Sequence, residues 1–229
     1  MEYRHELKFM VSDLTIEKLR HRLEPVMEKD EFHDDFYTIR SLYFDDLFDS
    51  CLNENLAGTD DRFKYRIRFY DDNKDYINLE KKYKKRGMTK KESQHLSLEQ
   101  VKSFMEGLDG LGTGAGDSFA ADLSTELMAA GLKSGMKPKC IVEYDRLAFV
   151  EPAGNVRITF DMNLRGSTDV ERFLDTTEEF ALPVVEPGMH ILEVKYDEFL
   201  PKYILQLVDL NNLHRQSFSK YAMVREVLG

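Results

Sequence analysis

Basic and acidic residues alternate with apolar residues along several short segments of this 229-residue chain. In residues 62–70, RFKYRIRFY, every second residue up to 68 is basic and those between are apolar. Successive side chains of a β-strand point to opposite faces, so this segment predicts a strand with one basic face. Arginine forks and lysines at this density suit phosphate, because guanidinium groups contact its oxygens in pairs.

Two further segments combine bases and carboxylates on one face. The polar face of residues 1–10 carries Arg4, Glu6 and Lys8, followed by Met10. The polar face of residues 76–84 carries Asn78, Glu80, Lys82 and Lys84, with Lys81 as the exception on the other face. Any half-buried strand has one polar face, so each segment alone indicates no more than contact with solvent. Because four or more strands share the pattern, a common charged surface is favoured.

The elements that position these residues are strands with helices between and after them. Strands are also expected at 37–44, 140–150, 156–164 and 189–197. Helices are expected at 13–24, from the capping box at Ser97 to Gly107, at 119–132, from Pro201 onward, and after Ser217 or Ser219. The glycine-rich segment 107–118 lacks the Lys-Ser/Thr of a P-loop, which favours a linker over a phosphate loop.

If this sheet closes into a barrel, the apolar stripes of the helices cover its outside and the polar faces line its lumen. Buried like charges are costly unless an anion compensates them. A linear tri- or polyphosphate fits the bases expected in the lumen, which are Arg4, Lys8, Arg66, Arg68, Lys82, Lys84, Arg146 and Arg157.

Four carboxylates are expected beside these bases, namely Glu6, Glu80, Asp161 and Glu193. They would repel phosphate unless a divalent cation such as Mg²⁺ or Mn²⁺ bridged them to it. For Glu6, Glu80 and Asp161, salt bridges to neighbouring bases are an equally good explanation. The six histidines show no metal-ligand spacing, so we expect none of them to bind metal.

The composition limits the possible partners and the location. The 42 acidic residues outnumber the 32 basic ones, giving a net charge of -10, which disfavours nucleic-acid binding through a basic surface. Seven bases lie in residues 81–91; we expect Lys82, Lys84 and Arg86 in the tunnel and Lys90 and Lys91 guiding a polyanion to its mouth. With no signal peptide, no 20-residue apolar span and no cysteine pattern around Cys51 and Cys140, a cytoplasmic protein without a membrane segment is expected.

The residues also resemble a known family. The motifs that carry the resemblance are YRHELKF (3–9), SLYFDD (41–46), KYRIRFY (64–70), LEKKYKKR (79–86), VEYDRLAF (142–149), VRITFD (156–161), ILEVKY (191–196) and SFSKYAM (217–223). In this order they are similar to the VTC domain, the polyphosphate-polymerase branch of the triphosphate tunnel metalloenzymes, over nearly the whole chain. Residues 1–229 are therefore expected to form a single catalytic domain of this type.

The resemblance implies an α+β fold whose centre is an eight-stranded antiparallel tunnel. It implies metal-dependent transfer of the ATP γ-phosphoryl group to a growing polyphosphate chain, with Mn²⁺ or Mg²⁺ as cofactor and ATP and polyphosphate as partners. The positions that match its catalytic bases are Lys8, Arg66, Arg68, Lys82, Arg146, Arg157 and Lys220. Glu193 matches the metal ligand. Further substrate contacts are expected from Arg4, Lys84, Tyr144, Lys195 and Ser219.

One motif departs from the wider superfamily. An ExExK pattern often opens those sequences, whereas this chain has Arg4, Glu6 and Lys8 at the equivalent positions. The difference favours the polymerase branch and weakens the case for Glu6 as a metal ligand. Two alternatives remain open: a triphosphatase, in which water attacks in the same tunnel, and a polyphosphate-binding module without catalysis.

Overall fold

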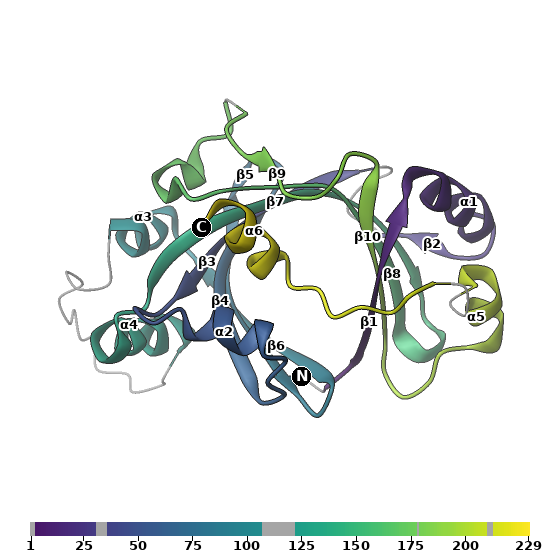
Figure 1. The fold of residues 1–229 in the computed structure, drawn as a ribbon, viewed down its shortest axis with the longest axis horizontal. Coiled ribbons are helices and arrows are strands. Elements are labelled where there is room, and N and C mark those ends of the chain that lie inside the picture. The colour runs from purple at the N-terminus through teal and green to yellow at the C-terminus, as the bar shows by residue number, and fades with distance from the viewer. Residues whose placement is uncertain (1–2, 31–35, 107–121, 178, 210–212) are drawn as a thin grey trace.

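The computed structural model describes residues 3–30, 36–106, 122–177, 179–209 and 213–229 (Figure 1). In these residues, eight strands form one curled antiparallel sheet in the spatial order β1-β10-β8-β7-β3-β4-β5-β6. Their bounds are β1 His5–Ser12, β3 Tyr37–Asp45, β4 Arg62–Tyr70, β5 Asn73–Lys85, β6 Met88–Leu96, β7 Lys137–Glu151, β8 Val156–Ser167 and β10 Met189–Tyr196. Short strands β2 (Glu28–Lys29) and β9 (Leu182–Pro183) pair with β7 and β8.

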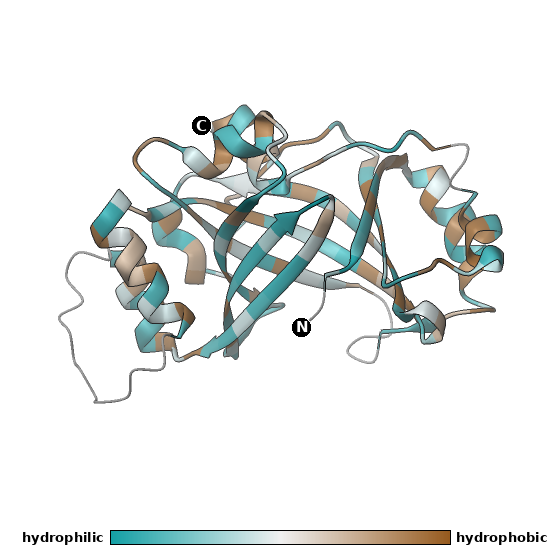
Figure 2. Ribbon diagram, turned by 90° about the horizontal axis from the view of Figure 1, so that it is seen from below, coloured by the Kyte–Doolittle hydropathy of each residue, from teal (hydrophilic) through white to brown (hydrophobic). Residues whose placement is uncertain are grey.

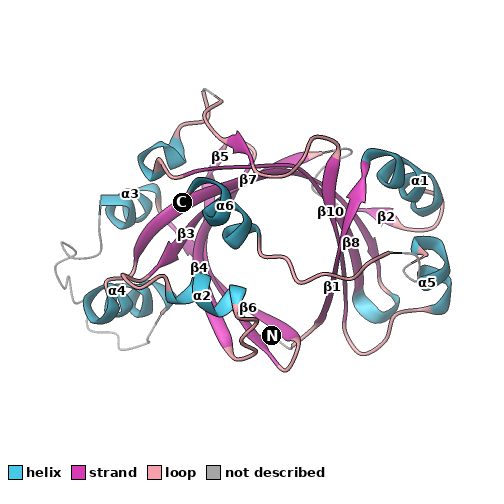
Figure 3. Ribbon diagram, viewed as in Figure 1, coloured by secondary structure: helices cyan, strands magenta, loops and turns pink. Residues whose placement is uncertain are grey.

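The two edge strands of this sheet meet. Just before β1, the amide of Arg4 donates to the carbonyl oxygen of Thr89 in β6, and the amide of Thr89 donates back to Arg4, both at 2.9 Å. The strands therefore form a ring, which Figure 3 shows end on. The predicted α+β class with an antiparallel barrel and flanking helices is confirmed.

Two of the three hydrophobic clusters lie outside the ring, between its apolar outer face and the helices. Helices α1 (Asp13–Leu23) and α5 (Lys202–Val208) cover β1, β8 and β10 on one flank, and α3 (Leu98–Glu106) and α4 (Leu123–Ser134) cover β4 and β5 on the other. Helices α2 (Ser50–Leu56) and α6 (Lys220–Leu228) pack together beside β3 and β7. Figure 2 shows apolar stripes on these helices and hydrophilic residues along the strands. The third cluster, which includes Tyr221 of α6, lies on the inner face of the ring, because its members Tyr43 and Val142 pair with Arg66 and Ser41. The polar strand faces line the rest of the inside.

The predicted strands are present, most of them longer than expected, and helix α3 begins with the expected capping box. Ser97 Oγ accepts from the amide of Gln100 at 3.2 Å, and Gln100 Oε1 accepts from the amide of Ser97 at 2.9 Å. The helix expected at 119–132 is α4, of which residues 123–134 are described. Pro201 precedes α5, and Ser219 caps α6.

The basic run 81–91 is corrected by the structure. It is a β-hairpin, in which β5 and β6 pair around a turn at Arg86 and Gly87, and both turn residues have positive φ. Lys90 forms an ion pair with Glu92 at 2.7 Å, and Arg86 is exposed at the turn rather than lining the tunnel. Strand pairing with β5 holds Lys90 and Lys91 in place.

Two further expectations from the sequence concern the glycine-rich segment and membrane-spanning helices. The glycine-rich segment 107–118 lies outside the described residues. Among the residues that the structure describes, no helix has both the length and the apolar character needed to span a bilayer.

Candidate active site

Strand register brings the predicted site residues together inside the ring. Lys8 in β1 pairs with Glu193 in β10, and Arg66 in β4 lies between Glu80 in β5 and Tyr43 in β3. In each of these strands the same alternating face points inward, so residues distant in sequence meet in the lumen.

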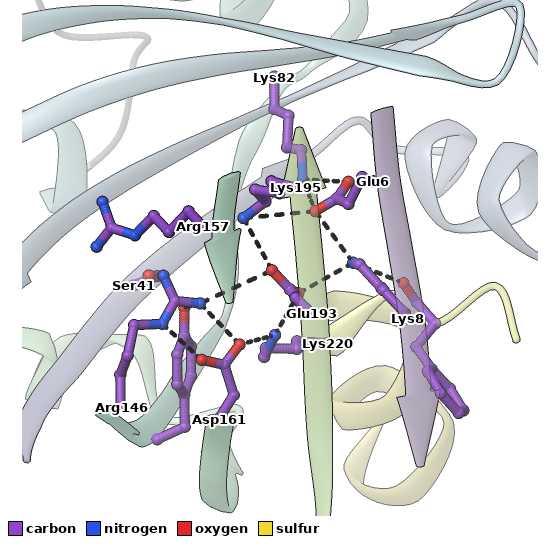
Figure 4. A network of polar contacts seen from close by, with 12 residues as sticks. Glu6, Lys8, Ser41, Lys82, Arg146, Arg157, Asp161, Glu193, Lys195 and Lys220 are labelled. Atoms are coloured by element: carbon purple, nitrogen blue, oxygen red, sulfur yellow. Dashed lines mark hydrogen bonds and ion pairs between the residues drawn. The ribbon is translucent and has the colours of Figure 1, made fainter. Parts of the chain in front are cut away.

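Glu193 is the centre of the largest ionic network (Figure 4). Its Oε1 lies 2.9 Å from Lys220 Nζ and 3.2 Å from Lys8 Nζ, and its Oε2 lies 2.9 Å from Lys195 Nζ. Burial by itself would raise the pKa of Glu193, but Lys195, Lys220, Lys8 and Arg146 outweigh it and hold the pKa well below its usual range. Glu193 is therefore a carboxylate at neutral pH.

Asp161 and Arg146 form a buried bidentate pair next to Glu193. Arg146 Nε lies 2.5 Å from Asp161 Oδ1, and its Nη2 lies 2.7 Å from Oδ2. Lys220 Nζ lies 2.5 Å from the same Oδ2, so one ammonium group bridges Asp161 and Glu193. Tyr144 joins this group, because its hydroxyl accepts from Arg68 Nη2 at 3.0 Å.

A second carboxylate on β1 is shared by three lysines. Glu6 lies 3.0 Å from Lys82, 3.6 Å from Lys195 and 3.7 Å from Lys8. One negative charge cannot compensate three ammonium groups. Burial, opposed by Glu6 but reinforced by Lys8 and Lys195, lowers the pKa of Lys82 well below its usual range.

Glu80 neutralises part of the arginine pair on β4. Its Oε2 lies 2.6 Å from Arg66 Nη2 and 3.9 Å from Arg68 Nη1, and its Oε1 lies 2.7 Å from Lys91 Nζ. Tyr43 hydrogen-bonds Arg66 from the other side at 2.9 Å. The Lys91 side chain is 38% exposed and lies at the edge of the lumen, outside the central cavity.

Lys64 stands out because the described residues supply it with no carboxylate in ion-pair range. Its ammonium group donates to Ser219 Oγ at 3.0 Å and lies 5.4 Å from the centre of the Tyr43 ring. Burial lowers the pKa of Lys64 to about 8, with Lys8 and Arg66 adding to the effect. Burial alone would raise the pKa of Tyr43, but the positive charges of Arg66, Lys64 and Arg68 outweigh it and lower that pKa to about 8.

The narrowest part of the lumen is strongly basic. A cavity of about 40 Å³ there has one carboxylate in its wall, Glu193. The basic residues in its wall are Lys8, Lys64, Arg66, Arg68, Lys82, Arg146, Lys195 and Lys220. The ion pairs described above cross this space. An anion with several oxygens can enter only by exchanging carboxylate partners for its own oxygens, and the excess of bases favours that exchange.

Larger cavities adjoin this centre on two sides. One, of about 300 Å³, shares Lys8, Lys64 and Lys82 with it, and a second, of about 450 Å³, shares Arg66, Arg68, Lys82, Arg146 and Lys195. The second continues into a cavity of about 630 Å³ through Tyr37, Tyr70, Lys91 and Arg157. The shared residues place a cavity on each side of the central constriction, and we call the outer ends of these cavities the mouths of the lumen.

Most predicted site residues meet at this centre, and three lie nearer the mouths. Arg157 pairs with Asp30 and donates to the Tyr37 hydroxyl at 3.1 Å, and in Figure 4 it points away from the Glu193 network. Arg4 pairs with Asp197 at 2.7 Å, and Lys84 lines the 300 Å³ cavity. Lys8, Arg66, Arg68, Lys82, Arg146, Lys195, Lys220, Tyr144 and the four carboxylates all take part in the networks of the lumen.

Sequence reasoning missed Lys64 and Tyr43 as site residues. Lys64 shares the inward face of β4 with Arg66 and Arg68, and this alternation was the signal that could have identified it. Tyr43 gave no such signal, because it lies in a strand whose inward face carries no base that lines the central cavity.

The carboxylates fit a metal ion only in part. The described residues hold no group of three or more acidic, histidine or cysteine side chains that could form a complete protein site. Glu193, with Asp161 or Glu6 joined to it through shared lysines, offers one or two carboxylates. Mg²⁺ is commonly held by one or two carboxylates together with substrate phosphates, so the residues suit an ion that arrives with its phosphate ligand.

Comparisons with solved structures identify the fold. A proposed adenylate cyclase of Vibrio parahaemolyticus is 12% identical in sequence, with a TM-score of 0.54, and the match covers 98% of both chains. A proposed adenylate cyclase of Bacillus halodurans is 15% identical, with a TM-score of 0.53, over 95% of this chain and 94% of that one. A protein of Pyrococcus horikoshii is 15% identical, with a TM-score of 0.51, over 98% and 99%. Identities this low show a shared fold alone.

Sequence comparison gives a more specific result. No curated protein matches the chain. A sequence model of one family, described as the VTC domain, matches residues 3–228.

Proposed function

The chain belongs to the VTC domain family, and on this basis we propose that it is a polyphosphate polymerase acting on ATP inside a triphosphate tunnel. The observation that carries the proposal is the central constriction, where eight bases and one carboxylate lie between larger cavities on two sides. A linear polyanion can contact these bases along its whole length, whereas a compact anion can contact only a few of them at one time. We propose further that residues 1–229 act as one catalytic domain.

The reaction needs positioning and charge compensation more than a protein nucleophile. A terminal oxygen of the polyphosphate chain attacks the γ-phosphorus of ATP, a new P–O–P bond forms, and the bond between the γ-phosphorus and the β,γ-bridging oxygen breaks to release ADP. Arg66, Arg68 and Arg146 provide forked donors for the phosphoryl oxygens, and Lys82 and Lys220 add charge beside them. Their ion pairs hold them in position before substrate arrives.

We assign the metal to Glu193, assisted by Asp161 or Glu6. A divalent ion bound there supplies positive charge to the phosphate oxygens and neutralises the repulsion between them and the carboxylates. Lys8, Lys195 and Lys220 hold Glu193 in the structure and have phosphate oxygens as alternative partners, so Glu193 would be the residue that holds the ion.

The test is product analysis. Purified protein is incubated with ATP and Mn²⁺, or Mg²⁺, with and without a short polyphosphate primer, and the products are sized on a gel while orthophosphate is measured. Growth of long-chain phosphate with release of ADP is expected. Orthophosphate release without chain growth would replace the proposal by a triphosphatase, and polyphosphate binding without turnover would replace it by a binding module.

A further inference from the structure

The two mouths of the tunnel differ in chemistry. The cavity of about 300 Å³ on one side has bases at its outer edge, namely Arg62, Lys84 and Arg215. We call this end the basic mouth. The cavity of about 630 Å³ on the other side is lined by three tyrosines, Tyr37, Tyr70 and Tyr76, by the uncharged Asn73, Asn78 and Ser93, and by three acids and two bases, namely Asp30, Asp71, Glu80, Lys91 and Arg157. We call this end the aromatic mouth.

This difference follows a gradient along two paired strands. On the inward face of β4 the residues run Arg62, Lys64, Arg66, Arg68 and Tyr70. On the inward face of β5 the corresponding order is Lys84, Lys82, Glu80, Asn78 and Tyr76. Register pairs Arg62 with Lys84 and Arg68 with Asn78, so both strands change from charged to neutral in the same direction. The tunnel wall therefore has a polarity along its axis.

Among the tyrosines at the aromatic mouth, Tyr76 presents a ring that a ligand can reach, whereas Tyr37 is buried. The rings of Tyr37 and Tyr70 lie 6.0 Å apart at 52°. Tyr76 is 60% exposed, and its ring lies 5.5 Å from that of His95 on β6. An exposed ring at the edge of a cavity is a stacking surface for a planar group, and nucleobases of any sequence stack on aromatic side chains.

We propose that the aromatic mouth receives the base and ribose of a nucleoside triphosphate, while the basic mouth holds the polyphosphate chain. This inference rests on the proposed function and gives the tunnel a direction. Arg68 and Tyr70 are two residues apart on one strand, about 7 Å. Phosphates held by Arg66 and Arg68 therefore leave the planar base of the nucleotide beside the tyrosines, at a mouth whose three acids and two bases disfavour a polyanion. The chain end, which is charged throughout, lies toward Lys64, Arg62 and Lys84.

The first test compares two ligands on one variant. Dissociation constants of ATP and of inorganic tripolyphosphate are measured by calorimetry in EDTA, where metal-dependent turnover is suppressed. Tyr76→Ala is expected to weaken ATP binding about tenfold, in the range of base stacking on an aromatic ring, and to change tripolyphosphate binding less than twofold. Tyr203→Ala, which removes a ring that is 41% exposed on α5, is the matched control and leaves both constants unchanged.

The second test locates the base directly. Azido-ATP, which carries a photoreactive group on the adenine, is cross-linked to the wild-type protein and the labelled peptides are identified by mass spectrometry. Labelling of residues 70–78 or 93–96 is expected. Labelling of residues 62–64, 84–87 or 215–218 would reverse the direction and overturn the inference, as would an equal loss of ATP and tripolyphosphate binding in Tyr76→Ala.

These outcomes are separate from the proposed function. A protein that binds ATP at the aromatic mouth but makes no polymer refutes the polymerase activity and leaves the direction intact. A protein that makes polymer while the base is labelled at the basic mouth keeps the polymerase activity and refutes the direction. A protein that binds polyphosphate but not ATP refutes both.

Discussion

Charge at single residues decides how the lumen responds to its ligand. Glu193 and Glu143 are both buried carboxylates that pair with bases, but they lie on opposite faces of the sheet. Glu143 contacts Arg40 and Arg165 on the outside, beside a cavity that shares no residue with the central cavity. Comparing a variant of Glu193 with a variant of Glu143 therefore distinguishes a role in the site from the general effect of losing a buried ion pair.

We expect Glu193→Gln to lower metal-dependent turnover by at least about a hundredfold, because the amide cannot supply the charge that a divalent ion needs. Glu143→Gln removes an equivalent buried charge and is expected to keep turnover within a few fold of the wild type. The measurement is initial rate against Mn²⁺ concentration, with unfolding midpoints recorded for both variants. Equal losses of rate would count against the role of Glu193.

Lys64 predicts a pH dependence of binding. With a pKa of about 8, lowered chiefly by burial, its ammonium group is charged below pH 8 and neutral above. A bound polyanion requires the charged form, so binding becomes weaker as pH rises through 8. Relative to Lys64→Arg, which stays charged, the wild-type affinity for tripolyphosphate should fall about tenfold between pH 7 and 9. Parallel pH curves for the two proteins would contradict this role.

At the scale of elements, helix α6 is held to the ring by a buried acceptor. Asp45 is fully buried and accepts from the amides of Cys51 and Leu52 and from the Tyr221 hydroxyl at 2.7 Å. Arg225 donates to the same hydroxyl at 2.8 Å. Because Lys220 precedes Tyr221 at the start of α6, these bonds also position a base of the tunnel.

Tyr221→Phe removes both bonds without removing the ring. We expect the free energy of unfolding to fall by about 1–3 kcal/mol, since each bond involves a charged partner and Asp45 stays buried. Denaturant titration measures the change, and Tyr203→Phe on α5 is the control, which should lie within about 0.5 kcal/mol of the wild type. An unchanged stability of Tyr221→Phe would show that α6 is held by packing alone.

The elements show which parts of the fold the sequence could predict. Strands such as β4 combine one apolar and one polar face, and their bounds follow from that alternation. Strand β6 was missed because MTKKESQHL is polar on both faces and forms only by pairing with β5 around the Arg86–Gly87 turn. Helix α2 was missed because it is short and begins at the Asp45 carboxylate, a tertiary contact.

The same limit applies to the site. Alternation predicts which residues face inward, and it placed Lys8, Arg66 and Glu193 on one surface. It does not predict which carboxylate meets which base, because that depends on strand order and register across β10, β8 and β7. The bridging of Glu193 and Asp161 by Lys220 could not be read from the sequence for this reason.

At the scale of the whole molecule, charge is segregated between the inside and the outside. The chain carries a net charge of -10, yet its central cavity is lined by eight bases and one acid. The acidic excess must therefore lie on the other surfaces. A polyanion that fits inside the ring compensates the repulsion between these bases, and a larger one meets an acidic exterior.

This segregation predicts a selective stabilisation. Tripolyphosphate at a hundred times its dissociation constant should raise the unfolding midpoint by about 5–10 °C, since it binds only the folded ring. Sodium chloride at equal ionic strength and duplex DNA at equal phosphate concentration should not raise the unfolding midpoint, because neither neutralises the positive charges inside the ring. Thermal unfolding measures all three, and an equal effect of chloride would show that general screening is responsible.

The single bridge between Arg4 and Thr89 that closes the ring has a topological consequence. A chain that lies in the tunnel is encircled, like a thread through a bead, and can leave only lengthwise. Escape of an encircled polymer requires sliding past every base in turn, so it becomes slower as the polymer grows. For the proposed polymerase, this closure would retain the product between additions, and opening the Arg4–Thr89 seam would convert retention into release.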